Sequence, residues 1–278
     1  MSRSQHPVAL RLERQVGGAT RLLATVMGLP LVDGIFAAVV LAGLLSTVGG
    51  ILQVGLLIFG GSATVAVILA ELDGEREETL RTVAVVGAVL IVGAGLEAAI
   101  APTIESALDM ATFERFAALV ILAIAAKTAS ARVGEWLPRP AVIVGLGLVA
   151  SLDLGHLALA VTLEPGLVLR AMAAAGVGVA FALAVAAFAP TLRDYVDLDR
   201  FRFGSAVALG TLPLGLLGVV PGNAPLAVLA VTALLAFDPD GGVAAARRRA
   251  RHLADGGEAL EAPPENRQGD ADERAPWL

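Results

Sequence analysis

The chain has 278 residues, 56% of them apolar, with a mean hydropathy of +0.78 and a net charge of −6. It contains no cysteine, which excludes disulfides, thiol catalysis and cysteine-ligated zinc or iron–sulfur sites. The three histidines, His6, His156 and His252, are far apart in sequence and argue against a histidine-rich metal site.

Long apolar segments follow one another along the chain, and several are long enough to cross a hydrocarbon layer of about 30 Å. They predict an all-α, polytopic transmembrane helical bundle of about eight spans. Pro30 predicts a kink in the first span, and two prolines around residue 223 divide the last apolar stretch into two spans. The predicted spans are 22–45, 50–70, 83–101, 112–131, 141–163, 167–189, 203–220 and 225–237.

Composition divides the chain into three parts. Residues 1–21 form a basic segment that we expect to be cytoplasmic, and residues 22–237 form the transmembrane domain, with halves 22–131 and 141–237. Residues 238–278 have too few apolar side chains for a core and predict a disordered cytoplasmic tail. The arginines at 247–251 are interpreted first as a topogenic stop and alternatively as a contact with lipid phosphates.

Basic residues predict the orientation of the spans. Arginines occur in the N-terminal segment, in the loops after the second, fourth and sixth spans, and in the tail. The turns on the opposite side, near Ser46, Pro102, Glu164 and Pro221, contain no arginine or lysine. By the positive-inside rule, the protein is expected to be a multi-pass plasma-membrane protein with both termini in the cytoplasm.

Two coincidences of position predict an internal repeat. Asp33 and Asp153 are 120 positions apart, and Pro102 and Pro221 are 119 apart. Halves of four spans each would be parallel and related by an axis along the membrane normal. The alternative is chance, because helices rich in glycine, alanine and valine match one another easily.

Asp33 and Asp153 are the first candidates for a functional site. A carboxylate at mid-membrane costs roughly 3 kcal/mol or more, so a function or a partner must offset it. In the repeat, the two carboxylates would approach each other and share a proton or a cation. Alternatively, neighbouring helices hydrogen-bond each aspartate, or Asp33 caps a helix that restarts beyond Pro30. His156 lies one helical turn after Asp153 and either pairs with it or relays a proton.

The glycine-rich centre of the second span is the other candidate. Gly60, Gly61 and Ser62 permit close packing of helices, or alternatively expose backbone to a substrate path. Glu97 is grouped with Glu105, Asp109 and Glu114 in a solvated rim of ion pairs on the outer side, and an acidic vestibule for cations is the alternative. Lys127 is expected to extend toward the cytoplasmic interface.

The sequence contains no HExxH, GxSxG or Walker A motif, so we do not expect an enzyme, a metal site or a cofactor. The expected partners are the lipid bilayer and a small cation or solute, and no nucleic acid. The first functional hypothesis is a secondary carrier of an ion or small solute that uses mid-membrane carboxylates. The second is a membrane scaffold or assembly protein that does not transport and whose aspartates are structural.

Two segments carry a resemblance to a known family. They are QHPVALRLERQVGGATRLLATVMGLPLVDGIFAAVVLAG and GILQVGLLIFGGSATVAVILAELDG. They resemble an uncharacterised family of haloarchaeal multi-spanning membrane proteins. The resemblance implies an archaeal plasma membrane and no specific activity. The E-x-G-D-[KR] motif of repeat-built cation/proton exchangers is absent from the sequence.

Overall fold

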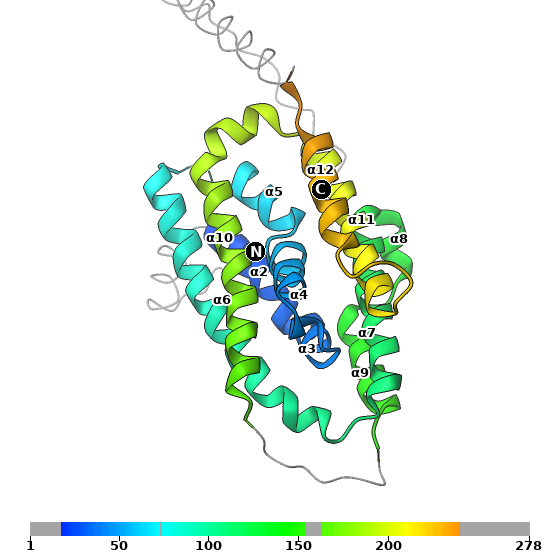
Figure 1. Cartoon of the computed structure of the whole chain (residues 1–278). Coiled ribbons are helices and arrows are strands. Elements are labelled where there is room, and N and C mark those ends of the chain that lie inside the picture. Colours follow the sequence, from blue (N-terminus) through cyan, green and yellow to red (C-terminus); the bar gives the residue numbers. More distant parts are fainter. Residues whose placement is uncertain (1–17, 73, 154–162, 240–278) are drawn as a thin grey trace, which may run out of the picture. The chain divides into compact units, whose positions relative to one another are not determined.

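A computed structural model of the chain describes residues 18–72, 74–153 and 163–239 (Figure 1). In these residues all regular elements are helices. The chain divides into two compact units, Met1–Asp238 and Pro239–Leu278, and all the helices below belong to the first. The predicted tail, the arginines at 247–251 and most of the predicted N-terminal segment lie outside the described residues.

The helices follow the predicted apolar segments in chain order. The elements are α2 (Gly18–Val32), α3 (Ile35–Leu41), the 3₁₀ helix η1 (Leu44–Ser46), α4 (Val48–Gln53), the π-helix η2 (Val54–Phe59), α5 (Ser62–Ala70), α6 (Arg76–Glu105), α7 (Met110–Ala129), α8 (Ala131–Trp136), α9 (Pro140–Ala150), α10 (Pro165–Tyr195), α11 (Leu198–Leu216) and α12 (Ala224–Ala236).

Two of the described helices, α6 and α10, are long and apolar enough to cross a membrane. The number rises to four if each of two bent pairs forms one span. These pairs are α2 with α3, bent by 41°, and α4–η2 with α5, bent by 47°. The predicted fifth span, 141–163, differs most from the structure, because α9 ends at Ala150 and residues 154–162 lie outside the described part.

The bent pairs occupy the middle of the helical unit. Figure 1 shows α6 and α10 side by side, and α7, α11 and α12 form a second group. Helix α3 contacts both α6 and α7, and α5 contacts both α10 and α11. Nearly all of α3 is buried, although it is only one short apolar helix. The two bent pairs therefore lie between the α6–α10 pair and the group formed by α7, α11 and α12.

The outer face of α6 carries large apolar side chains, which are 56–71% exposed. They recur every three or four residues and so form one stripe along the helix. The buried face of α6 carries Val83, Val86 and Leu90 in its first half and mainly small residues, such as Ala94 and Ala98, in its second half. Large apolar residues outside and small ones inside are typical of helices that pack in lipid, whereas a water-exposed stripe of this size is rare. The stripe consists of Val85, Val89, Val92, Leu96 and Ile100.

Glycines bring the second bent pair against α10. A Cβ placed on Gly55 would lie 2.6 Å from the Ala174 carbonyl oxygen, and one placed on Gly178 would lie 2.5 Å from the Phe59 Cβ and 2.8 Å from the Gly55 carbonyl oxygen. Real Cβ atoms essentially never come this close. The π-helix η2 and α10 therefore touch through their backbones, as small residues allow in membrane bundles.

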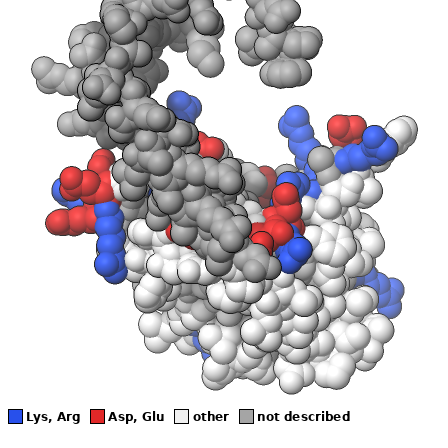
Figure 2. Space-filling model, turned by 90° about the horizontal axis from the view of Figure 1, so that it is seen from above, with Lys and Arg blue, Asp and Glu red and all other residues white. Residues whose placement is uncertain are grey.

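Arginines cap helices at one end of this unit. Arg193, in α10, donates hydrogen bonds to the carbonyl oxygens of Leu69 and Leu72 at 2.8 and 2.7 Å, next to the C-terminus of α5. Arg202, in α11, donates one at 3.2 Å to the Thr128 carbonyl oxygen near the end of α7. The bonds to Leu69 and Thr128 satisfy carbonyl groups that a helix end leaves free, and the bond to Leu72 holds the chain just after α5. Figure 2 shows basic and acidic side chains on the face seen from above, beside a broad uncharged area.

The contact between η2 and α10 predicts a large difference between two neighbouring glycines of α10. We expect Gly178→Ala to lower the free energy of unfolding by about 1–3 kcal/mol, because the new methyl group would overlap Phe59 and Gly55. Gly176→Ala is the control, since its Cβ would meet no heavy atom within 4 Å. Denaturant titration of both variants in detergent micelles measures the difference, and equal stability would contradict this packing.

Candidate functional site

The first helix break places a carboxylate at the centre of the bundle. Helix α2 ends at Val32, Asp33 and Gly34 separate it from α3, and Gly34 has φ 74°, a left-handed conformation that glycine adopts without strain. The Asp33 amide donates to the Leu29 carbonyl oxygen at 2.8 Å, so the backbone turns without losing this bond. Asp33 is half-buried, and its side chain has no hydrogen-bond or ion-pair partner among the described residues.

The second break lies between η2 and α5. The Gly60 amide donates to the Gly55 carbonyl oxygen at 2.8 Å, and the Thr64 hydroxyl donates to the Phe59 carbonyl oxygen at 2.9 Å. These two bonds satisfy the backbone at the end of the π-helix. The amide of Ser62, the first residue of α5, has no such partner in the described part of the chain. The helix thus begins with its first amide free, whereas the Thr64 amide donates to the Gly61 carbonyl oxygen at 3.0 Å.

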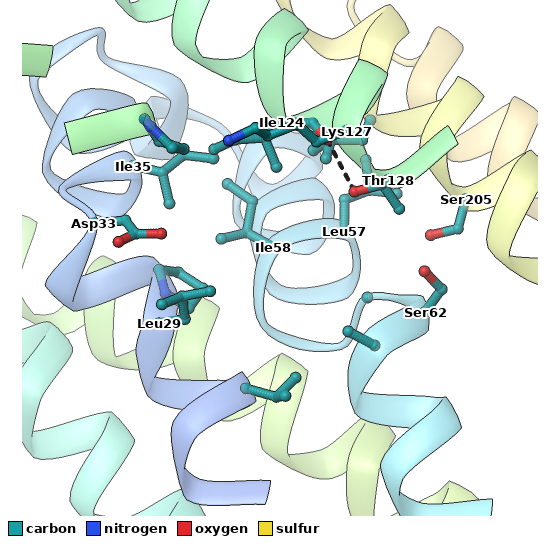
Figure 3. A pocket seen from close by; sticks show the side chains of 16 residues that line it. Leu29, Asp33, Ile35, Leu57, Ile58, Ser62, Ile124, Lys127, Thr128 and Ser205 are labelled. Carbon is teal, nitrogen blue, oxygen red and sulfur yellow. Dashed lines mark hydrogen bonds between the residues drawn. The ribbon is translucent and has the colours of Figure 1, made fainter. Parts of the chain in front are cut away.

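Both breaks open into one pocket of about 370 Å³ (Figure 3). Asp33 contributes to it from the first break, and Gly61 and Ser62 contribute from the second. Helix α7 adds Lys127 and α11 adds Ser205. Most of the remaining lining is aliphatic, which is usual for small-molecule sites with a few placed polar groups. The aliphatic and proline side chains are Val26, Leu29, Pro30, Ile35, Leu57, Ile58, Ala63, Ile124, Pro140 and Leu209.

The hydroxyl groups of Ser62 and Ser205 face the pocket at the end away from Asp33 (Figure 3). These two residues are 7% and 4% exposed, and neither hydroxyl has a hydrogen-bond partner within the described ranges. Among the described residues, the fully buried polar side-chain atom without a partner is Glu97 Oε2, so the two serine oxygens are accessible from the pocket. Thr128 differs, since its hydroxyl donates to the Ile124 carbonyl oxygen at 2.9 Å. The two serines are therefore available to a ligand.

Lys127 brings a second charge to the pocket. Its stem packs near Gly134, whose Cβ would lie 3.3 Å from the Lys127 Cγ. The ammonium group forms no ion pair with Asp33 or with another described residue. The pocket therefore holds a carboxylate and an ammonium that do not neutralise each other by direct contact.

Glu97 is a third acidic group in the helical core. It projects from α6, and its carboxylate lies beside the backbone amide of Ala37, in the first turn of α3. Its Oε2 atom is buried and has no hydrogen-bond partner in the residues described. Glu97 was grouped from the sequence with a solvated rim, but the structure places it against the first broken pair.

The candidates named from the sequence occupy several places. Asp33, Gly61 and Ser62 meet in the pocket, whereas a Cβ on Gly60 would lie 2.7 Å from the ring of Phe181, as expected for close helix packing. Asp153 does not line this pocket; it follows the end of α9, and its amide donates to the Ala107 carbonyl oxygen at 3.0 Å. His156 lies outside the described residues. In 18–72, 74–153 and 163–239 no cluster of three metal-ligating side chains occurs.

Two lining residues were not selected from the sequence. Lys127 is the sole lysine of the chain and falls within an apolar segment. A charged residue in such a segment is by default a functional candidate, so the sequence alone could have identified Lys127 as a site residue. Ser205 carries no comparable signal, because small hydroxyl residues are common at helix contacts.

Comparison with known protein families gives one match. Residues 90–217 match the model of a family of unknown function (DUF5794). The matched part extends from within α6 to the end of α11 and includes Lys127 and Ser205, but not Asp33 or Ser62. Neither the curated proteins nor the solved structures include a match to this chain.

The cysteine-free chain makes the convergence of Ser62 and Ser205 directly testable. We expect Ser62→Cys combined with Ser205→Cys to be joined by a short bifunctional thiol reagent, because both side chains face the same end of the pocket. Intact mass spectrometry distinguishes one bridging reagent from two separate additions. The control pair combines Ser62→Cys with Val207→Cys, an exposed position on α11. Two separate additions in the Ser62–Ser205 pair would contradict the arrangement.

Proposed function

We propose that this protein is a multi-pass membrane protein that acts as a secondary carrier of an ion or small solute. The observation that carries the proposal is that two interrupted helices, each bent by more than 40°, open into the same pocket. In a bilayer, broken helices are tolerated where they line a cavity, and carriers use such breaks as substrate sites. In this proposal Asp33 is the principal site residue, and Gly61 and Ser62 line the same pocket.

The membrane setting is supported by the surface of the helical unit. The exposed apolar stripe on α6 would be costly in water at roughly 25 cal/mol per Å², and lipid removes this cost. We propose about eight passes, because each predicted span overlaps a described helix or bent pair. The arginine distribution supports a plasma-membrane orientation with both termini in the cytoplasm.

The proposal does not require the parallel four-plus-four repeat or a haloarchaeal source, and both stay predictions. It also assigns the functional role to Asp33 alone, and not to Asp33 and Asp153 together. A membrane scaffold would give no reason for a pocket that an unpaired carboxylate and two unpartnered hydroxyls face.

The orientation predicts opposite accessibility for two exposed positions. We expect Ser46→Cys, in the turn before α4, to react in intact cells with a thiol reagent that cannot cross membranes. Glu75→Cys, just before α6, should react only after the membrane is permeabilised. Labelling of both positions from the same side would contradict an odd number of crossings between them.

The transport role predicts that the two aspartates behave differently. In reconstituted vesicles, we expect Asp33→Asn to reduce flux of the transported solute at least tenfold, because the pocket loses its carboxylate. Asp153→Asn should retain most of the flux, because Asp153 does not line the pocket. The panel should contain monovalent cations, small anions and amino acids, with flux normalised to folded protein. Wild-type vesicles that move none of them, or flux unchanged by Asp33→Asn, would contradict the carrier.

A further inference from the structure

The pocket has two chemically different ends. At one end lies the carboxylate of Asp33, which makes no ion pair in the described residues. At the other end lie the hydroxyls of Ser62 and Ser205, both more than nine-tenths buried and without partners there (Figure 3). An acceptor with negative charge is thus separated from a group of donors by an aliphatic wall.

The start of α5 adds to the donor end. This nine-residue helix begins at Ser62, and no side chain caps it. Its first amides and the positive end of the helix dipole favour a negative group at this point. The start of α3 provides a comparison, since the Glu97 carboxylate lies beside the Ala37 amide there. The protein thus supplies a carboxylate at one break and none at the other.

Lys127 gives the same pocket a positive charge that Asp33 does not pair. An anion bound alone would bring a second negative charge into the pocket with Asp33, and a cation bound alone would bring a second positive charge in with Lys127. Like charges in one pocket of low dielectric constant repel each other, so either singly charged ligand would be disfavoured. A ligand carrying one charge of each sign can satisfy both residues without adding net charge.

We propose that the pocket binds a small zwitterion with an apolar side chain, of the α-amino acid class. Its ammonium group contacts Asp33, and its carboxylate lies at the serine end near the start of α5, with Lys127 adding positive charge. The aliphatic lining receives its side chain, and a volume of about 370 Å³ suits a small solute. This inference rests on the proposed carrier function and names its substrate class.

The test uses three probes that share one carbon skeleton. Leucine has both charges, leucinol keeps only the ammonium, and 4-methylpentanoate keeps only the carboxylate. We expect isothermal calorimetry on the full chain in detergent to give leucine the highest affinity, with each singly charged analogue weaker by tenfold or more. Equal affinity of leucine and 4-methylpentanoate, or of leucine and leucinol, would overturn the proposal, as would binding of none of the three.

Two variants assign the charges to their residues. Asp33→Asn should weaken leucine at least tenfold and leave 4-methylpentanoate unweakened. Lys127→Met should weaken both carboxylate probes and leave leucinol unweakened. The matched controls are Asp199→Asn on α11 and Arg115→Met on α7, whose side chains are exposed outside the pocket, and both should bind as the wild type does. Leucine affinity unchanged in both pocket variants would overturn the assignment.

The result also separates this inference from the carrier proposal. If leucine binds through Asp33 but vesicles move no solute of the panel, the carrier proposal fails and the zwitterion site stands. If vesicles move a singly charged solute in an Asp33-dependent manner and leucine neither binds nor moves, the carrier proposal stands and the zwitterion site fails.

Discussion

The close approach of the π-helix η2 to α10 is the contact on which the rest of the arrangement depends. Gly55 and Gly178 let the two backbones touch, since any side chain at either position would overlap the opposite helix. This contact places an interrupted helix at the centre of the unit, next to the long and continuous α10. The π-helical turn widens the backbone just before the break at Gly60 and Gly61. Single π-turns are uncommon and often occur at functional sites.

Interrupting a helix leaves backbone groups that need hydrogen-bond partners. The two breaks of this chain differ in how these groups are satisfied. At the first break, Gly34 turns the backbone and the Glu97 carboxylate lies beside the new helix. At the second, the Thr64 hydroxyl satisfies the end of η2, but the start of α5 remains open toward the pocket. An apolar environment makes an unsatisfied donor expensive. The open start of α5 is consistent with a site that is completed when a ligand binds.

Much of the helical organisation was predictable from the sequence, because long apolar segments and prolines report local structure directly. Pro30 and the Asp33–Gly34 pair indicated a break in the first span, and the structure has one there. The end of α9 was not predictable in this way. Apolar residues continue beyond Ala150 in the sequence, yet the helix stops and Asp153 binds the connection after α6 instead. Tertiary hydrogen bonds overrode the apolar pattern at this point.

The residues of the candidate site also differ in whether one segment of the sequence or only the folded structure reveals them. An aspartate within a long apolar segment is visible from that segment alone, and this signal pointed to Asp33. The pairing of Asp33 with Asp153 relied on sequence spacing, and spacing does not say which helices touch. The pocket instead unites Asp33 with Ser62, Lys127 and Ser205, which come from four different elements of the fold. Ser205 could have been recognised only after α11 was placed beside α5.

The unequal rigidity of the elements suggests how one pocket could serve a carrier. Helices α6 and α10 are continuous over 30 and 31 residues, and glycines and alanines fix their contact with each other and with η2. The breaks that line the pocket contain Gly34 and Gly61, and glycines at helix breaks accept changes of backbone angle at low cost. A change in either bend would move Asp33 or Ser62 while leaving the α6–α10 pair in place. In the proposed carrier, alternating access would require motion only of the half-helices that line the pocket, because the groups proposed to bind the ligand lie next to the two breaks.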